Sequence, residues 1–353
     1  MNGFMEKSRT HYRRLLPLFF LLFAGVVVLT VTQVRVPNVC YNEQLDAAKQ
    51  MARASSILVS QERELGISPN PVTDPNCTGF IGAEFTPITT TVGALTSKRT
   101  STNPDFAALL VRLLDELHLK PGTRVVLSFS GSFPALNLAA ILACEELGLE
   151  PLIFSSIGAS SYGATYPQMT WLDMERLFVK HGIIHHRTSF ASLGAEGDLG
   201  ESFFLEGKAA ALEAIKRNNL IPIIMRTPKE QWNFKVEKIR SFHPELLINV
   251  GGNQINVGQD GYLLPPGILI HTSLDPSRLG LIGWFLSQHL PVVHLLRIRD
   301  LALRYGLPID PVPLPVPGES TIYYQIRVRI SLVILIYLLI GSYVFYLYRS
   351  VYK

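Results

Sequence analysis

The chain has 353 residues and a formal net charge of +4, with 48% hydrophobic and 17% charged residues. This composition is too apolar for an ordinary soluble protein and too rich in charge for a protein that lies wholly within a membrane. The apolar residues are therefore expected to be concentrated in particular segments of the chain.

Two uncharged stretches lie near the ends of the sequence. Residues 15–34 carry no charged side chain, and about 20 residues at 1.5 Å rise each cross a hydrocarbon layer of roughly 30 Å. Residues 330–347 are equally free of charge, and their tyrosines suit the headgroup level of a bilayer. We predict transmembrane helices at residues 15–34 and 330–348.

A cleaved signal peptide is the alternative interpretation of the first stretch. Lys7, Arg9, Arg13 and Arg14 form the basic leader that signal peptides share. The apolar run is long for a signal peptide, however, and residues 30–40 offer neither a small-x-small cleavage site nor a good lipidation box before Cys40. These features favour an uncleaved anchor.

The orientation of the two spans follows from the distribution of basic residues. The four basic residues before the first span place the N-terminus in the cytoplasm, and a second span returns the C-terminus to the same side. Arg327 and Arg329 flank the second span on the outer side and count against this orientation, although long domains translocate with little regard to charge. In a bacterium this would be a protein of the cytoplasmic membrane with two spans, both termini cytoplasmic and its main domain extracytoplasmic.

The region between the spans is predicted to hold one large domain. A helix is expected over residues 41–66, followed by a turn-rich stretch at 68–79 and a threonine-rich segment at 82–106 that has no clear assignment. Asn103 before Pro104 is a helix-start signal. Short apolar runs then alternate with helical patterns. The strands are expected at 124–129, 151–156, 183–187, 221–224, 245–250 and 291–296, and the helices at 105–119, 134–148, 170–182, 202–218, 228–239, 276–289 and 298–306.

Apolar strands joined by helices indicate a parallel sheet that is covered on both faces. We therefore predict an α/β fold, a doubly wound, mostly parallel sheet with helices on both faces, flanked by one N-terminal and one C-terminal transmembrane helix. The expected organisation is a cytoplasmic basic tail (1–14), a span (15–34), an N-terminal extension (35–102), the α/β domain (103–307), a proline-rich strap (308–329), a span (330–348) and a cytoplasmic tail (349–353).

Small polar residues gather where three of the predicted strands end. The stretches are "SFSGS" (128–132), "SSIGASSYG" (155–163) and "GGNQ" (251–254), and Arg187 and Arg226 end two further strands. Ligands of open parallel sheets bind outside the carboxyl ends of the strands, and amides, hydroxyls and glycines there suit an anion. The predicted substrate-binding residues are Ser128, Ser130, Gly131, Ser156, Ser160, Arg187, Arg226, Gly251, Gly252 and Asn253.

Purely structural roles are the competing interpretation of these residues. A serine before Pro134 is an ordinary helix cap, and a glycine after a strand is an ordinary turn residue. "SFSGS" departs from the GxSxG nucleophile elbow, yet a serine on a strand-to-helix turn is well placed for attack, so Ser132 is the predicted catalytic residue and Ser130 the alternative.

For several other polar and charged residues, a structural role also competes with a functional one. Lys98 and Arg99 are interpreted as part of a solvated loop, although among so many threonines they are also candidates to hold a carboxylate or phosphate. Thr170 and Asp173 match a capping box, which explains both without catalysis. His185 and His186 would face opposite sides of a strand and so cannot share one metal ion.

No metal site and no cofactor are predicted, because the dinucleotide and P-loop fingerprints and any cysteine–histidine cluster are missing from the sequence. Cys144 lies on an apolar helix, where a buried free thiol is expected. Whether Cys40 and Cys77 form a disulfide stays open at this point. From the residues alone the predicted ligand is an anion and the predicted partner is the lipid bilayer, with no nucleic acid.

Four stretches resemble a known family. These are "GAEFTPITTTVGALTSKRTSTNPDFAALLVRLL", "SFSGSFPALNLAAILACEELGL", "SSIGASSYGATYPQMTWLDMERLF" and "NVGGNQINVG". Together they resemble the bacterial poly-gamma-glutamate system protein over nearly the whole chain, both spans included. The resemblance implies a cell-envelope accessory of poly-gamma-glutamate capsule synthesis and polymer export that works beside an amide ligase, a small membrane subunit and a metallophosphatase-like protein. It assigns no catalytic residue.

Two functions follow from the sequence. The first is a membrane-anchored module that binds the anionic polymer or its assembly partners. The second is a serine-dependent acyl-transfer enzyme or hydrolase of gamma-glutamyl amide bonds, with His185 or His271 as the base for Ser132 or Ser130. A histidine nitrogen within about 3 Å of a serine hydroxyl would favour the enzyme.

Overall fold

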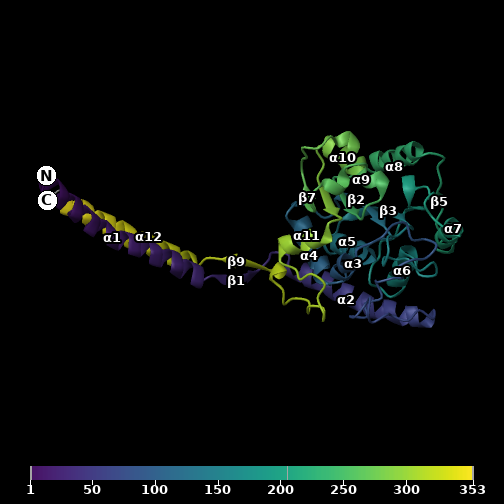
Figure 1. The fold of residues 1–353 in the computed structure, drawn as a ribbon, viewed down its shortest axis with the longest axis horizontal. Coiled ribbons are helices and arrows are strands. Elements are labelled where there is room, and N and C mark those ends of the chain that lie inside the picture. Colours follow the sequence, from purple (N-terminus) through teal and green to yellow (C-terminus); the bar gives the residue numbers. More distant parts are fainter. Residues whose placement is uncertain (1, 205, 352–353) are drawn as a thin grey trace. The chain divides into compact units, whose positions relative to one another are not determined.

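The computed structural model describes residues 2–204 and 206–351, and its elements are labelled in Figure 1. The chain divides into two compact units. One consists of Met1–Val39 together with Tyr324–Lys353, and the other is Cys40–Tyr323. Met1, Tyr352 and Lys353, which belong to the predicted cytoplasmic tails, lie outside the described residues.

The first unit is a pair of helices joined to a two-stranded ladder. It contains α1 (Asn2–Val31), β1 (Val34–Pro37), β9 (Tyr324–Arg327) and α12 (Ile330–Val351), and β1 pairs antiparallel with β9. The two helices lie side by side (Figure 1), and Gly25 is close enough to Ile336 that an added Cβ would lie 3.0 Å from its Cγ2. The start of α1 and the end of α12 therefore lie at the same end of this unit (Figure 1).

Only part of the predicted membrane organisation is visible in the helices of this unit. Residues Ile330–Ser350 are long and apolar enough to cross a bilayer, whereas Leu15–Val31 is a shorter apolar helix. The first span was expected to reach Val34, but α1 ends at Val31 because Val34 starts the β-ladder with β9. Membrane insertion itself stays a prediction.

The second unit is built on a seven-stranded sheet with the order β5-β4-β3-β2-β6-β8-β7. All neighbouring strands are parallel except β7, which pairs antiparallel with β8. The strands are β2 (Arg124–Ser130), β3 (Glu150–Ser156), β4 (Phe190–Ser192), β5 (Pro222–Ile223), β6 (Leu246–Val250), β7 (Gly267–Leu269) and β8 (Val292–Leu295). The predicted α/β fold with a mostly parallel sheet is thereby confirmed.

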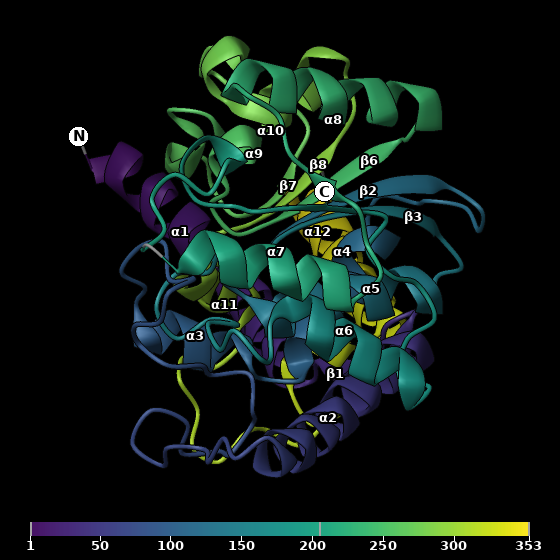
Figure 2. The same cartoon turned by 90° about the vertical axis from the view of Figure 1, so that its right-hand side faces the viewer.

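Helices cover both faces of this sheet, as Figure 2 shows, with α4, α5 and α6 on one side and α8 and α10 on the other. The helices of the unit are α2 (Tyr41–Glu64), α3 (Leu95–Ser101), α4 (Asp105–Asp115), α5 (Pro134–Glu146), α6 (Trp171–Lys180), α7 (Gly207–Arg217), α8 (Pro228–Phe242), α9 (Gln254–Val257), α10 (Gly280–Ser287) and α11 (Ile298–Tyr305). Every residue of β6 is buried, as a strand between two helical layers requires.

Local sequence signals explain where several helices begin. Pro134 occupies the first turn of α5, where its missing N–H costs no hydrogen bond. The predicted capping box of Thr170 and Asp173 is present at the start of α6 and is confirmed. Asn103 accepts the N–H of Asp105 through Oδ1 at 3.0 Å, which satisfies an amide at the start of α4.

The strand predicted at residues 183–187 is wrong. The chain there is a loop, and β4 starts three residues later, at Phe190. The backbone N–H groups of His185 and His186 donate to the carboxylate of Glu145, at 2.7 and 2.8 Å, and so are not available to a neighbouring strand. The sheet also contains one strand, β7, that was not predicted from the sequence.

Candidate functional site

A pocket lies at the carboxyl ends of β2, β3 and β6, three strands that are neighbours in the sheet. Ser130 pairs with Ser156 in the register of β2 and β3, and Phe129 pairs with Val250 of β6, so the three strands end close together. The cavity has a volume of about 630 Å³. Six of the predicted site residues line it, namely Ser130, Ser132, Ser156, Ser160, Gly252 and Asn253.

Two predicted glycines lie behind the pocket wall and allow the strand ends to approach each other. A Cβ on Gly131 would overlap the carbonyl oxygen of Ile157, and the Gly131 N–H donates to Gly158 O at 3.2 Å. Gly251 has a φ of +85°, and a Cβ there would overlap the hydroxyl of Ser130. Both positions therefore need glycine for backbone reasons.

Ser128 lies in the interior of the fold and not in the pocket. It is a residue of β2 with 1% of its surface exposed, and its hydroxyl donates to Asn256 Oδ1 at 3.0 Å. Ser128 is two residues before Ser130 on the same strand, so both side chains point to the same face of the sheet, but Ser128 lies farther from the strand end and from the pocket. The sequence could not show that Asn256 would lie against Ser128 on this face of the sheet.

The two predicted arginines do not reach the pocket. Arg187 precedes β4 and so lies toward the amino end of that strand, where its Nε is 3.9 Å from the buried carboxylate of Glu175. The mistaken strand at 183–187 caused this error. Arg226 follows β5, the edge strand, and its side chain is exposed while its N–H donates to Glu230. Two strands, β4 and β3, lie between β5 and β2, the central strand of the pocket.

The predicted histidine bases are also far from the serines. His185 and His186 both contact Glu145, with Nδ1 at 3.2 and 2.8 Å from its carboxylate oxygens. His271 is exposed and follows β7, the opposite edge strand of the sheet. Among the described residues that line the pocket there is no histidine, so the predicted serine–histidine pair is wrong.

The pocket contains instead a buried lysine. Lys98 lies on α3 with 2% of its surface exposed, in a segment interpreted from the sequence as a solvated loop. Its Nζ lies 2.7 Å from Ser160 Oγ, donates to the carbonyl oxygen of Ser132 and is 4.1 Å from the ring centroid of Phe133. The neighbouring Arg99 turns away and pairs with Asp310, so this interpretation was wrong for both residues.

Burial lowers the pKa of Lys98 from 10.5 to about 7. Desolvation is the cause, since removal from water disfavours the ammonium form. In the described part of the chain no carboxylate forms an ion pair with Lys98, and its hydrogen-bond partners are the neutral Ser160 and Ser132. The pocket thus holds a buried amine that gains or loses a proton near neutral pH.

A second buried lysine lies beneath the pocket, and its charge is compensated. Lys235 Nζ is 2.9 Å from Asp198 Oδ2, and both side chains are buried. Asp198 Oδ1 accepts from Asn253 Nδ2 at 2.8 Å and from the hydroxyl of Ser192 at 2.8 Å. This network holds Asn253 in place, where its Oδ1 also caps α9 by accepting the N–H of Ile255.

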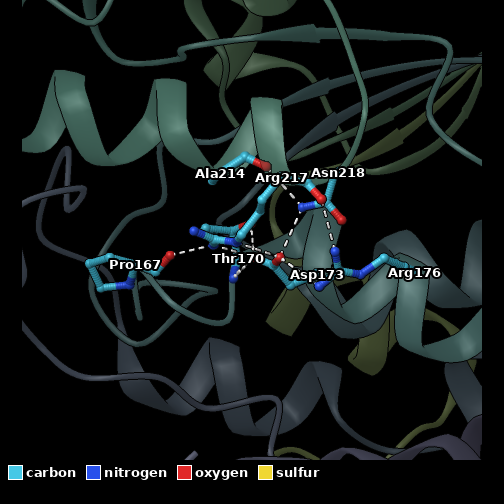
Figure 3. A network of polar contacts seen from close by, with 7 residues as sticks. All are labelled: Pro167, Thr170, Asp173, Arg176, Ala214, Arg217 and Asn218. Atoms are coloured by element: carbon cyan, nitrogen blue, oxygen red, sulfur yellow. Dashed lines mark hydrogen bonds and ion pairs between the residues drawn. The ribbon is translucent and has the colours of Figure 1, made fainter.

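Another polar cluster, around Asp173, has a structural role (Figure 3). Its carboxylate is 3% exposed and accepts from Arg217 Nε and Asn218 Nδ2, each at 2.8 Å. Thr170 donates to the same carboxylate from its N–H and its hydroxyl, at 2.8 and 2.7 Å. A cavity of about 510 Å³ lies beside this cluster, but its one buried charge is fully paired and ties α6 to α7.

Within residues 2–204 and 206–351 no group of three or more histidine, cysteine, aspartate or glutamate side chains is arranged to hold a metal ion. The three cysteines are free thiols, with Cys40 and Cys144 buried and Cys77 exposed. Burial raises the pKa of Cys40 to about 12, so this thiol stays protonated at neutral pH.

Comparison with known proteins adds no relative. No family model matches the chain, and neither a curated protein nor a solved structure is found to be similar to it. The function has to be inferred from the site itself and from the resemblance of the four sequence stretches.

Proposed function

We propose that the chain is a membrane-anchored accessory protein of poly-gamma-glutamate synthesis or export, and that its pocket binds carboxylate groups of this anionic polymer. The single observation that carries the binding role is Lys98, a buried amine in an open pocket without an acidic partner in the described chain. An ammonium group in this position is costly until an anion enters, so the pocket favours an anionic ligand.

The groups around Lys98 suit a carboxylate. The hydroxyls of Ser132, Ser160 and Ser202 line the cavity together with the amide side chain of Gln254. Hydrogen bonds from such donors to a charged oxygen contribute about 1.5–3 kcal/mol each. The exposed Glu196 also lines the cavity and would repel a carboxylate that bound beside it, which directs the ligand toward Lys98.

The membrane part of the proposal rests on the helix pair of the first unit. Ile330–Ser350 is long enough to span a bilayer, and the shorter Leu15–Val31 is preceded by the basic residues of the N-terminal segment. With the N-terminus in the cytoplasm, a hairpin of two spans places both termini there and residues 40–323 outside. The partners implied by the resemblance, the amide ligase and the other subunits of the system, would supply the polymer at the membrane.

Binding of a gamma-linked glutamate oligomer to the detergent-solubilised full chain tests the proposed function. We expect calorimetric binding that the Lys98→Met substitution weakens by at least about tenfold, the equivalent of 1.4 kcal/mol, because the charged partner is lost. Lys208→Met is the matched control, since Lys208 is exposed on α7 and should leave the affinity unchanged. No binding by the wild-type chain, or equal losses in both variants, would contradict the proposal.

Reporter fusions test the proposed topology independently. A reporter fused after Lys353 should be active only in the cytoplasm, and one inserted near Asn70, in the turn-rich stretch after α2, only outside it. The opposite pair of results would overturn the localisation but not the carboxylate site.

A further inference from the structure

Ser160 and Lys98 form the closest serine–amine contact in the described chain. Ser160 follows β3, at the rim of the pocket, where its side chain is partly exposed. Its hydroxyl oxygen lies 2.7 Å from Lys98 Nζ, and the same Nζ contacts the carbonyl oxygen of Ser132. A neutral amine has two hydrogens and one lone pair, so it can donate to that carbonyl while it accepts the hydrogen of the Ser160 hydroxyl.

We propose that Ser160 and Lys98 are a nucleophile and its general base, and that the pocket catalyses acyl transfer from carboxylic amides or esters. This activity goes beyond the binding role proposed above and does not depend on the identity of the polymer. A serine becomes a useful nucleophile when a base within hydrogen-bond reach removes its proton, and a buried, uncompensated lysine is such a base. The sequence had placed this role on Ser132 or Ser130 with a histidine.

The groups present account for every proton of the step. Ser160 Oγ forms a bond to the acyl carbon while its proton moves to the neutral amine of Lys98. The bond between the acyl carbon and the leaving nitrogen or oxygen then breaks, and the Lys98 ammonium returns the proton to that leaving group. Water or an acceptor amine attacks the resulting ester on Ser160, losing its proton to Lys98, and the acyl product leaves as Ser160 recovers its hydrogen.

Ser132 occupies a supporting position in this arrangement. Its hydroxyl oxygen accepts the N–H of Ser160 at 3.0 Å, which fixes the backbone of the nucleophile. The Ser132 O–H remains a donor within the same pocket, and a donor there is able to stabilise negative charge on an acyl oxygen. Gly93 supports the same geometry, because a Cβ there would overlap the carbonyl oxygen of Ser161 and crowd Lys98 Cε at 3.1 Å.

The protonation state of Lys98 gives the activity a defined pH dependence. Glu196 is the other ionisable side chain among the described residues that line the pocket, and desolvation alone accounts for the lowered pKa of Lys98. The base is neutral above a pKa of about 7 and protonated below it. Reaction at Ser160 should therefore accelerate as the pH rises from 6 to 8.

Covalent labelling of the detergent-solubilised full chain with a fluorophosphonate probe tests the proposal. Ser160 Oγ should displace fluoride from phosphorus, and mass spectrometry of the digest should place the adduct on Ser160. We expect no labelling of Ser160→Ala and a rate about 10²–10⁴-fold lower for Lys98→Met, the usual contribution of a general base. Ser241→Ala is the matched control because Ser241 is exposed on α8, outside the residues that line the pocket, and this variant should label normally at Ser160.

Each outcome decides the question if the variants retain the wild-type circular dichroism spectrum. An adduct on Ser160 whose formation rate rises with pH through about 7 supports the pair. No adduct, an adduct on Ser132 that persists in Ser160→Ala, or an unchanged rate in Lys98→Met overturns it. Calorimetry with the glutamate oligomer on the wild-type chain separates the two proposals, since binding without labelling leaves only the binding role and labelling without binding leaves only the activity.

Discussion

Two polar clusters of the α/β unit each bury one ionisable side chain but differ in whether its charge is compensated. At Asp173 a buried carboxylate meets an arginine, an asparagine and a threonine, so its charge is compensated within the fold. At Lys98 a buried amine meets serine hydroxyls and a carbonyl oxygen, so its charge is not compensated. Charge pairing, more than residue type or cavity size, therefore separates a structural junction from a ligand site, because an unpaired buried charge costs folding free energy.

The largest expected effect concerns the pH dependence of stability at Lys98. Burial lowers the pKa of this residue from 10.5 to about 7, so between these values the unfolded chain binds one more proton than the folded chain. The free energy of unfolding should then rise with pH by about 1.4 kcal/mol per unit within this window, and the penalty is full below pH 7. Lys98→Met removes this contribution.

Urea unfolding in detergent at pH 7 and pH 9 measures this effect. The stability difference between Lys98→Met and the wild type should shrink by roughly 2–3 kcal/mol between the two pH values. Parallel pH profiles would mean that Lys98 is charged and compensated, like the lysine paired with Asp198, and the comparison between the two clusters would fail.

Removal of Asp173 should give an effect of similar size, on stability alone. Asp173→Ala leaves Arg217 and Asn218 without their main acceptor and deletes the capping box of α6, so we expect a loss of about 3 kcal/mol in the free energy of unfolding. Asp46→Ala is the matched control, since its pair with Lys49 is largely exposed and should contribute no more than about 1 kcal/mol. A loss of oligomer binding in folded Asp173→Ala would show that this cluster is also part of a ligand site.

Two serine substitutions should give the smallest effects, one on ligand affinity and the other on stability. Ser132→Ala removes a donor from the pocket and should weaken binding of the glutamate oligomer by at least roughly tenfold, the lower end of the about 1.5–3 kcal/mol expected for a bond to a charged group. Ser128→Ala removes a hydrogen bond to Asn256 inside the fold and should lower stability by about 1 kcal/mol with unchanged affinity. Calorimetry and urea unfolding of both variants measure these changes, and the reverse pattern would place the ligand elsewhere.

The sequence predicted the sheet well where hydrophobic periodicity was strong. The strands at 124–129, 151–156 and 245–250 agree with β2, β3 and β6 to within a few residues, and the helix at 134–148 agrees with α5. The apolar runs fix these elements because both faces of the strands are buried. At 183–187 the same pattern misled, since Ile183 and Ile184 are buried in a loop whose amides bind Glu145.

The candidate site was predictable in its location but not in its chemistry. The serines and glycines at the strand ends follow from the rule that ligands bind at the carboxyl ends of a parallel sheet. Lys98 was missed as a buried group because the threonine-rich segment has no periodicity, and only tertiary packing turns residues 95–101 into a helix beside Ser160. The feature of the sequence that pointed to this role was a lysine within a segment rich in serine and threonine. On that basis Lys98 was also a candidate to hold a carboxylate.

Titration of the Lys98 amine itself shows whether this pocket binds an anion. Carbon-13 labelling at the lysine Cε position, with Lys98→Met to assign the resonance, allows its pKa to be read by NMR with and without the gamma-linked glutamate oligomer. We predict a midpoint near pH 7 in the free protein and a rise of at least one unit when the oligomer binds, because a carboxylate stabilises the ammonium form. A midpoint near 10.5 in the free protein, or one that the oligomer does not move, would contradict the assignment of this pocket as an anion site.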